Sequence, residues 1–149
     1  MTIRFLGGFG KTESYWWQML YISTMTRRRI ALVACVKEKQ SRSAKAKDMY
    51  VSKVFKSWMN YAESWGANQI YILSGKYGLL ELDEKINPYD FNLNFVKPQE
   101  RKLWAQQVIQ NLGDKARLNE DEFLVLANPT YSEYLIPHLK HYSMPLEIE

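Results

Sequence analysis

The sequence predicts an α/β protein: a small three-layer, Rossmann-like domain with a mainly parallel sheet of three or four strands. First, three apolar runs have the length of a strand and no polar alternation, which is typical of strands buried on both faces of a parallel sheet; they are residues 30–35, 69–74 and 123–127. Second, segments with helical periodicity separate these runs, as in βαβ units. Third, 149 residues that are 46% hydrophobic suit one domain with one core.

The first apolar run, residues 30–35, is expected to be a central strand, and the polar and basic residues 36–49 after it are expected to form a loop. Ser52 then has the character of an N-cap. Apolar residues recur at helical spacing as far as Trp65, and Gly66 supplies a stop signal. The sequence therefore predicts a helix between Ser52 and Gly66.

The second strand, residues 69–74, leads into a glycine-containing turn at residues 75–78. Residues 79–97 contain acids, asparagines and no clear period, and they are expected to form a long irregular loop. Pro98 is suited to the first turn of a helix, and Gly113 to its end. A second helix is therefore expected between these two residues.

The third strand, residues 123–127, is followed by an apparent capping box in which Thr130 and Glu133 are three residues apart. This pattern predicts a third helix over residues 131–141. Residues 143–148 are expected to begin a fourth strand.

The domain organisation predicted from these elements is one α/β domain over residues 25–149. Residues 1–24 precede the first strand and a second methionine, Met25, so we expect them to be an N-terminal extension or a flexible arm.

The composition excludes several classes of protein. A single cysteine excludes an intramolecular disulfide and a cysteine zinc cluster, and neither a metal nor another cofactor is expected. No stretch reaches the ~18 apolar residues of a membrane helix, and the N-terminus is a poor signal peptide, so we expect a cytoplasmic protein without a membrane partner. The sequence carries no signal for an oligomeric state.

The basic residues are concentrated in one part of the chain. Residues 27–56 hold ten Lys and Arg against two acids, a net charge of +8, whereas the rest of the chain carries −4. A basic region on a mildly acidic body favours a phosphate-bearing partner, namely a nucleotide or a nucleic acid, and binding that weakens with salt. The alternative is a solvated lysine face without a ligand.

Polar or small residues follow all three predicted strands, where parallel strands of an open sheet bind ligands. The residues selected by this rule are Cys35, Val36, Lys37, Ser74, Gly75, Lys76, Tyr77, Asn128, Thr130 and Tyr131. Two glycines and a lysine in residues 74–78 are able to cradle an anion, although a plain glycine turn has the same pattern. Cys35 is either a buried structural thiol or a nucleophile.

Asp90 and Tyr89 lie in the long loop after the second strand. A carboxylate near a strand-end pocket can stabilise a developing cation or act as a general base, and the alternative is a solvated turn aspartate. Tyr89 is either a residue that stacks on a base or an aromatic packed onto the core. His138 and His141 lack a third metal ligand nearby, so a solvated helix end is the better interpretation.

Four separated motifs resemble a family of small bacterial and phage proteins that form a domain of unknown function. The motifs are ALVAC with Lys37 and Lys39 at residues 31–39, DMYVS at residues 48–52, ILSGKYGLL at residues 72–80 and PYD at residues 88–90. Trp104 and the third strand with Tyr131 are also similar to that family. Its members continue past the fourth strand, so the resemblance implies that this chain, which ends at Glu149, is truncated at its C-terminus.

The segment after the first strand also resembles the catalytic domain of archaeosine synthase, which implies chemistry on a modified base, a nucleotide or a glycosidic bond. We therefore expect an enzyme that acts on a nucleotide or on a modified base in nucleic acid, at a glycosidic bond, as a hydrolase or a base-exchange transferase. Asp90 and Cys35 would be catalytic, while Lys47 and Asp48 would close over the pocket with Tyr89. The alternative is a non-catalytic nucleotide- or nucleic-acid-binding module.

Overall fold

The computed structural model describes residues 27–145, so the predicted extension, residues 1–24, lies outside the described part of the chain. Its main feature is a five-stranded sheet with the strand order β4-β3-β1-β6-β7. In chain order the strands are β1 (Arg29–Ala34), β3 (Gln69–Ser74), β4 (Gly78–Glu81), β6 (Glu122–Leu126) and β7 (His141–Ser143). All neighbouring pairs are parallel except β3 and β4, so the expected α/β fold with a mainly parallel sheet is confirmed.

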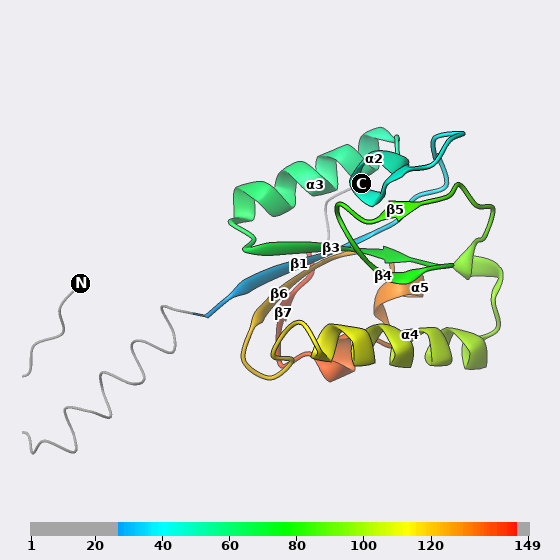
Figure 1. Ribbon diagram of the computed structural model, residues 1–149. Helices are drawn as coiled ribbons and strands as arrows, with labels where there is room; N and C mark the ends of the chain where they lie inside the picture. The colour runs from blue at the N-terminus through cyan, green and yellow to red at the C-terminus, as the bar shows by residue number, and fades with distance from the viewer. Residues whose placement is uncertain (1–26, 146–149) are drawn as a thin grey trace, which may run out of the picture.

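Helices lie on both faces of the sheet. The long helix α3 (Lys53–Trp65) and the short α2 (Ala46–Met49) lie on one face, and α4 (Pro98–Gly113) and the short α5 (Pro129–Ser132) lie on the other (Figure 1). The core forms around β1, whose residues after Arg29 are all buried because parallel strands flank it on both sides. Over residues 27–145, no helix combines the length and the apolar character needed to cross a membrane.

The two long helices have the ends that the sequence predicts. The Ser52 hydroxyl accepts a hydrogen bond from the backbone N–H of Phe55 at 3.1 Å, which caps α3. Gly66 ends that helix with φ of 88°, a left-handed conformation that favours glycine. Helix α4 begins at Pro98, whose missing N–H costs nothing in the first turn.

The sheet has more strands than the three or four expected, partly because β4 comes from the segment predicted to be irregular. Gly78 adopts φ of 76° and pairs with Ser74, so the chain reverses tightly and Leu80 pairs with Ile72. This edge strand has only four residues and one antiparallel neighbour. A run that short carries no periodic signal, which explains the wrong prediction.

The predicted third helix over residues 131–141 is also wrong. Helix α5 ends at Ser132, and a 3-10 helix (Ile136–His138) follows before β7. Pro137 lacks the N–H that a continued helix needs and disfavours helical backbone in the residue before it. The Glu133 carboxylate does not cap a helix but accepts a hydrogen bond from Arg101 at 2.6 Å.

Residues 36–49 are more ordered than the predicted loop. They contain β2 (Ala44–Lys45), which pairs with β5 (Lys85–Ile86), and then α2. An isolated antiparallel bridge joins Lys39 to Tyr50, and Ala46 and Met49 are buried. The predicted fourth strand starts earlier than expected, because β7 covers His141–Ser143 and residues 146–149 lie outside the description.

Candidate functional site

A cleft of about 790 Å³ lies beyond the carboxyl ends of β1 and β6. Five of the residues predicted from the sequence line it, namely Cys35, Lys37, Asp90, Asn128 and Tyr131. They come from three separate parts of the chain: the segment after β1, the loop before α4, and the turn after β6. The parallel strands β1 and β6 bring the first and the last of these parts together because their carboxyl ends share one edge of the sheet, and the loop before α4 reaches the same edge.

The floor of the cleft contains a thiol next to a phenol. The Cys35 sulfur lies 3.2 Å from the Tyr131 hydroxyl oxygen, and both residues are buried. Burial raises the pKa of Tyr131, and the Cys35 thiol raises it further. The Tyr131 ring contacts Trp104 edge to face, with centroids 5.5 Å apart, and Trp104 Nε1 donates to the Ser74 carbonyl at 2.9 Å. These contacts hold the thiol and the phenol in place on the sheet edge.

Three hydroxyl groups form a chain beside this floor. The Tyr89 hydroxyl lies 2.8 Å from Ser74 Oγ and 2.6 Å from the Tyr50 hydroxyl. Burial raises the pKa of Tyr50 to about 12, with a further contribution from Cys35. Burial is also the main cause of the raised pKa of Tyr89. The three groups are therefore neutral near neutral pH, and Tyr89 packs partly against the core.

Asp90 follows Tyr89 and is exposed at the cleft. Within the described part of the chain, no hydrogen bond or ion pair holds its carboxylate. It is therefore accessible to a ligand, and its position depends on the anchoring of Tyr89 rather than on its own contacts.

The cleft also contains a group of aromatic and amide side chains that the sequence analysis missed: Phe91, Asn92, Asn94 and Phe95. Phe95 is 88% exposed and Phe91 is 41% exposed. Asn94 and Phe95 belong to a 3-10 helix (Leu93–Phe95), in which Leu93 is buried and the Asn92 Oδ1 accepts from the Asn94 N–H at 2.9 Å, and Phe91 precedes this cap. The signal that could have identified them is the sequence Phe-Asn-Leu-Asn-Phe in a loop next to Asp90.

The absence of a side chain at Gly75 allows Phe91 to approach the end of β3 closely. A Cβ atom at Gly75 would lie 3.1 Å from Phe91 Cδ1 and 3.4 Å from the Tyr131 hydroxyl. Glycine thus leaves room for Phe91 and Tyr131 at the end of β3. Ser74 is fully buried, and its Oγ accepts a hydrogen bond from the Tyr77 N–H at 3.0 Å.

Two lysines line the cleft, and one of them has a defined position. Lys39 Nζ donates to the Lys37 carbonyl at 3.1 Å and lies 4.5 Å from the Tyr89 ring centroid. Lys39 was not among the residues expected in the pocket. Lys76 was expected in the pocket, but it is exposed and does not line the cleft. Its Nζ lies 5.4 Å from the centroid of the Tyr77 ring.

Lys47 and Asp48 do not join the cleft. They line a separate groove of about 850 Å³ between residues 40–51 and α3. Lys47 forms an ion pair with Asp83 at 3.1 Å and thereby lowers the pKa of that carboxyl. Both residues lie in the segment that the Lys39–Tyr50 bridge closes, and of the two bridge residues Lys39 lines the cleft whereas Tyr50 lines the groove.

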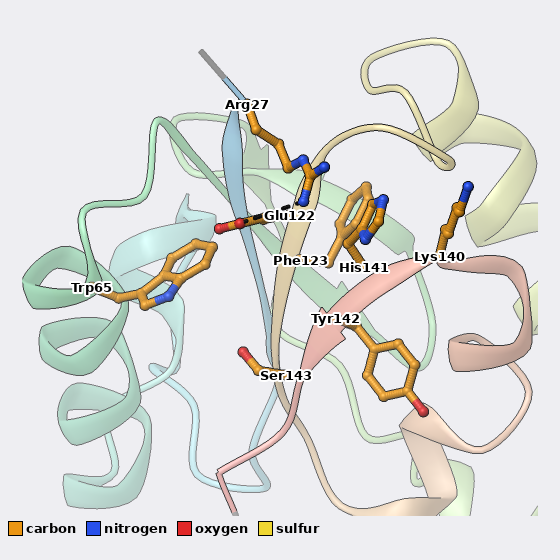
Figure 2. Close-up of a pocket in the computed structure, with 8 residues that line it drawn as sticks. All are labelled: Arg27, Trp65, Glu122, Phe123, Lys140, His141, Tyr142 and Ser143. Atoms are coloured by element: carbon orange, nitrogen blue, oxygen red, sulfur yellow. Dashed lines mark ion pairs between the residues drawn. The ribbon is translucent and has the colours of Figure 1, made fainter. Parts of the chain in front are cut away.

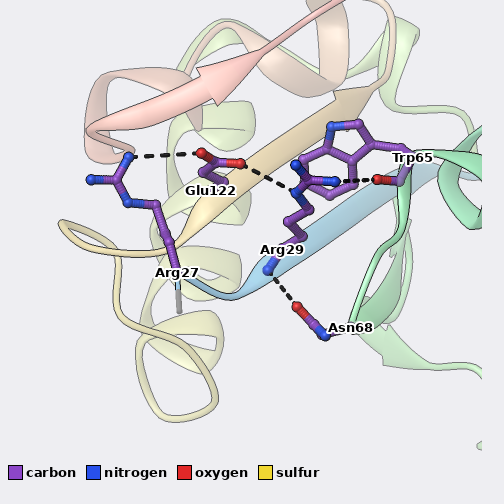
Figure 3. A network of polar contacts seen from close by, with 5 residues as sticks. All are labelled: Arg27, Arg29, Trp65, Asn68 and Glu122. Atoms are coloured by element: carbon purple, nitrogen blue, oxygen red, sulfur yellow. Dashed lines mark hydrogen bonds and ion pairs between the residues drawn. The ribbon is translucent and has the colours of Figure 1, made fainter. Parts of the chain in front are cut away.

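A third hollow, of about 450 Å³, lies at the opposite end of the central strands (Figure 2). Its polar network is internally paired: the Glu122 carboxylate lies 3.7 Å from an Arg27 nitrogen and 3.6 Å from Arg29 Nε (Figure 3). Arg29 also donates to the Trp65 carbonyl at 2.7 Å, and its N–H donates to Asn68 Oδ1 at 2.8 Å. This network joins β1 to β6 and to the end of α3, which is a structural role.

The basic region of the sequence, residues 27–56, is thus split between the two ends of β1. Residues 27–29 lie at the amino end of β1, away from the cleft. Residues 36–56 follow the carboxyl end of β1 and carry seven Lys and Arg against two acids, a net charge of +5.

Over residues 27–145, no three His, Cys, Asp or Glu side chains come close enough together to hold a metal ion.

Comparison with known proteins identifies a family for this fold and cleft. The searches of curated proteins and of solved structures found no match. Residues 30–148 match the model of a family of unknown function, DUF6884. The match includes all five strands of the sheet except Arg29, the first residue of β1. It also includes every residue named above as lining the cleft. The chain therefore belongs to the DUF6884 family of unknown function.

Proposed function

We propose that the protein is an enzyme that acts on a nucleotide, or on a modified base in nucleic acid, at the glycosidic bond. The observation that carries this proposal is the exposed aromatic pair Phe91 and Phe95 in a cleft that also holds Lys37, Lys39 and Asp90. An 88% exposed phenylalanine costs hydration free energy, and stacking on a base would recover it.

The base and the phosphate of a nucleotide each have a counterpart in the cleft. The Phe91 and Phe95 rings offer faces to a base, and the amides of Asn92, Asn94 and Asn128 offer donors and acceptors to its edge. Lys37 and Lys39 supply positive charge for a phosphate. This assignment agrees with the general rule for parallel α/β sheets and with a Rossmann-like, three-layer arrangement, which we infer from helices on both faces of the sheet.

The reaction that we propose needs a carboxylate, and among residues 27–145 Asp90 is the one that lines the cleft. The bond between the sugar C1′ and the base breaks, and its electron pair leaves with the base, which takes up a proton from solvent. Water adds to C1′ and gives a proton to Asp90, which also stabilises the positive charge that develops on the sugar and afterwards releases the proton to solvent. The Cys35 and Tyr131 pair can donate a hydrogen bond to the ligand from the floor. The resemblance to archaeosine synthase supports the same class of chemistry.

A second function, a non-catalytic nucleotide- or nucleic-acid-binding module, is favoured by one observation. The Asp90 carboxylate has no hydrogen-bonding partner in residues 27–145 that would orient it for catalysis. The same base and phosphate contacts would serve such a module. The two functions differ in turnover, so a mutation of Asp90 separates them.

The aromatic contact is tested by Phe95→Ala. Titration calorimetry with the four mononucleotides and with short oligonucleotides should show an affinity about ten- to a hundredfold lower than wild type, because a stacked base loses its partner. The matched control is Leu103→Ala on α4, which removes a side chain that is 64% exposed outside the cleft and should leave affinity unchanged. Equal affinity of Phe95→Ala and wild type for every probe would contradict the proposal.

A further inference from the structure

We infer that the substrate is a single-stranded polynucleotide, whose backbone runs from the cleft over residues 36–51 into the groove beside α3. This inference rests on the proposed function and adds the class of substrate to it. It starts from the position of the groove, which has a volume of about 850 Å³ and shares a wall with the cleft.

The shared wall is a short hairpin-like pair of extended segments. Gln40 N–H donates to the Met49 carbonyl at 2.9 Å, and Val51 N–H donates to the Glu38 carbonyl at 3.1 Å, on either side of the Lys39–Tyr50 bridge. Lys39 lines the cleft, whereas Gln40 and Tyr50 line the groove. The two depressions are therefore one wall apart, and a continuous ligand can occupy both.

The groove offers contacts suited to a sugar-phosphate backbone. Lys56 and Asn60 come from α3, and Gln40, Lys45 and Lys47 come from the facing segment. Amides and ammonium groups are common partners of phosphate and sugar oxygens.

Acidic residues offset most of the positive charge of the groove. Asp48 and Glu63 also line the groove, and Asp83 pairs with Lys47 and, at 3.7 Å, with Lys45. The Asp83 side chain is 72% exposed, and such exposed pairs are weak, so phosphates can compete for these lysines. Along the groove, the lysines exceed Asp48 and Glu63 by one charge, and the adjoining segment, residues 36–56, carries +5 by sequence.

A free mononucleotide does not explain this arrangement. A base held by Phe95 and a phosphate held by Lys37 or Lys39 fill the cleft side of the wall, and the lysines of the groove lie on its other side. A chain that spans the wall gains these additional phosphate contacts. A single strand is required because a base in a duplex is stacked and paired, and its faces are not accessible to Phe91 and Phe95.

The test compares adenosine 5′-monophosphate with a single-stranded oligoadenylate of about 10 nucleotides, at about 50 and about 200 mM salt. We expect the oligomer to bind at least about tenfold more tightly at the lower salt, and to lose affinity as salt rises. Lys45→Ala/Lys56→Ala should weaken oligomer binding and reduce the slope of log K against log salt by about 1.4, or about 0.7 for each lost phosphate contact. Its affinity for the monophosphate should not change.

The matched control, Lys102→Ala/Lys140→Ala, removes the same charge from exposed lysines outside the groove and the cleft. Equal affinity for monomer and oligomer, or equal effects of the two double variants, would overturn this inference. If Phe95→Ala still weakened monophosphate binding, the proposed function would survive that result. If Phe95→Ala changed binding of neither probe, the proposed function itself would fail.

Discussion

The Tyr89 hydroxyl lies 2.8 Å from the Ser74 hydroxyl oxygen, and this contact joins the loop that carries Asp90 to the end of β3. Tyr89 also reaches the Tyr50 hydroxyl at 2.6 Å, so one phenol connects three segments of the chain. Asp90 has no such anchor of its own in residues 27–145. The position of this cleft-lining carboxylate thus depends on its neighbour in sequence.

The first prediction concerns the stability that this contact provides. Tyr89→Phe keeps the ring and removes the hydroxyl, which leaves the buried Tyr50 and Ser74 hydroxyls each with one partner fewer. We expect the free energy of unfolding to fall by about 1–3 kcal/mol, as measured by urea unfolding. The control is Tyr77→Phe, whose hydroxyl makes one longer bond of 3.3 Å to the Asn87 carbonyl at the surface. A change of less than about 0.5 kcal/mol in Tyr89→Phe would show that the network contributes little.

The second prediction is a loss of stability in alkali. The pKa of Tyr50 is about 12 in the folded protein, against about 10 in an unfolded chain. Because the pKa is higher in the folded protein, the stability that neutral Tyr50 contributes is fully present below about pH 10. This contribution is lost as the pH rises towards about 12. Between these values Tyr50 alone lowers the free energy of unfolding by about 1.4 kcal/mol per pH unit. The pKa values of Tyr89 and Tyr131 are also raised, so they act in the same direction.

Urea midpoints measured from about pH 9 to about pH 11 check this prediction. Tyr50→Phe should flatten the decline of the midpoint with pH, because one group that resists ionisation has been removed. Tyr142→Phe, at a side chain that is 47% exposed, should leave the decline as in wild type. The same decline in all three proteins would contradict the contribution that we assign to Tyr50.

Strong local signals predicted most of the fold. The three apolar strands β1, β3 and β6 lie within one residue of the predicted runs, and the long helices begin and end near the predicted cap and stop residues, such as Ser52 and Gly66 around α3. The rule that parallel strands share a carboxyl edge then placed Cys35, Asn128 and Tyr131 at one cleft, although they are far apart in sequence.

The features that sequence reasoning missed depend on contacts between distant residues. Lys47 was expected in the pocket, but the bridge between Lys39 and Tyr50 and the ion pair with Asp83 hold it on the other side of a wall. Phe95 was overlooked because an exposed aromatic in a loop has the same sequence pattern as a buried one. Only the packing of Leu93 below the loop determines which side chain points outward.

The last prediction separates an enzyme from a binding module through Asp90→Asn. The substitution keeps the size and shape of the side chain and removes its negative charge. Cleavage of a glycosidic bond passes through a cation-like sugar, so an enzyme should lose at least about 10²-fold in turnover while its affinity for substrate changes little. In a binding module there is no turnover to lose, and affinity for a phosphate-bearing ligand should stay level or rise, because a repelling charge has been removed.

The assay is release of the free base from modified and unmodified nucleotides and oligonucleotides, measured for wild type and Asp90→Asn side by side. Asp114→Asn makes the same chemical change at the exposed C-cap of α4, away from the cleft, and should behave as wild type. Full turnover in Asp90→Asn would remove this carboxylate from the mechanism. Tight binding by wild type without turnover on any of these substrates would refute the enzyme and support the binding module, because the cleft would then hold a nucleotide without the chemistry that we assign to Asp90.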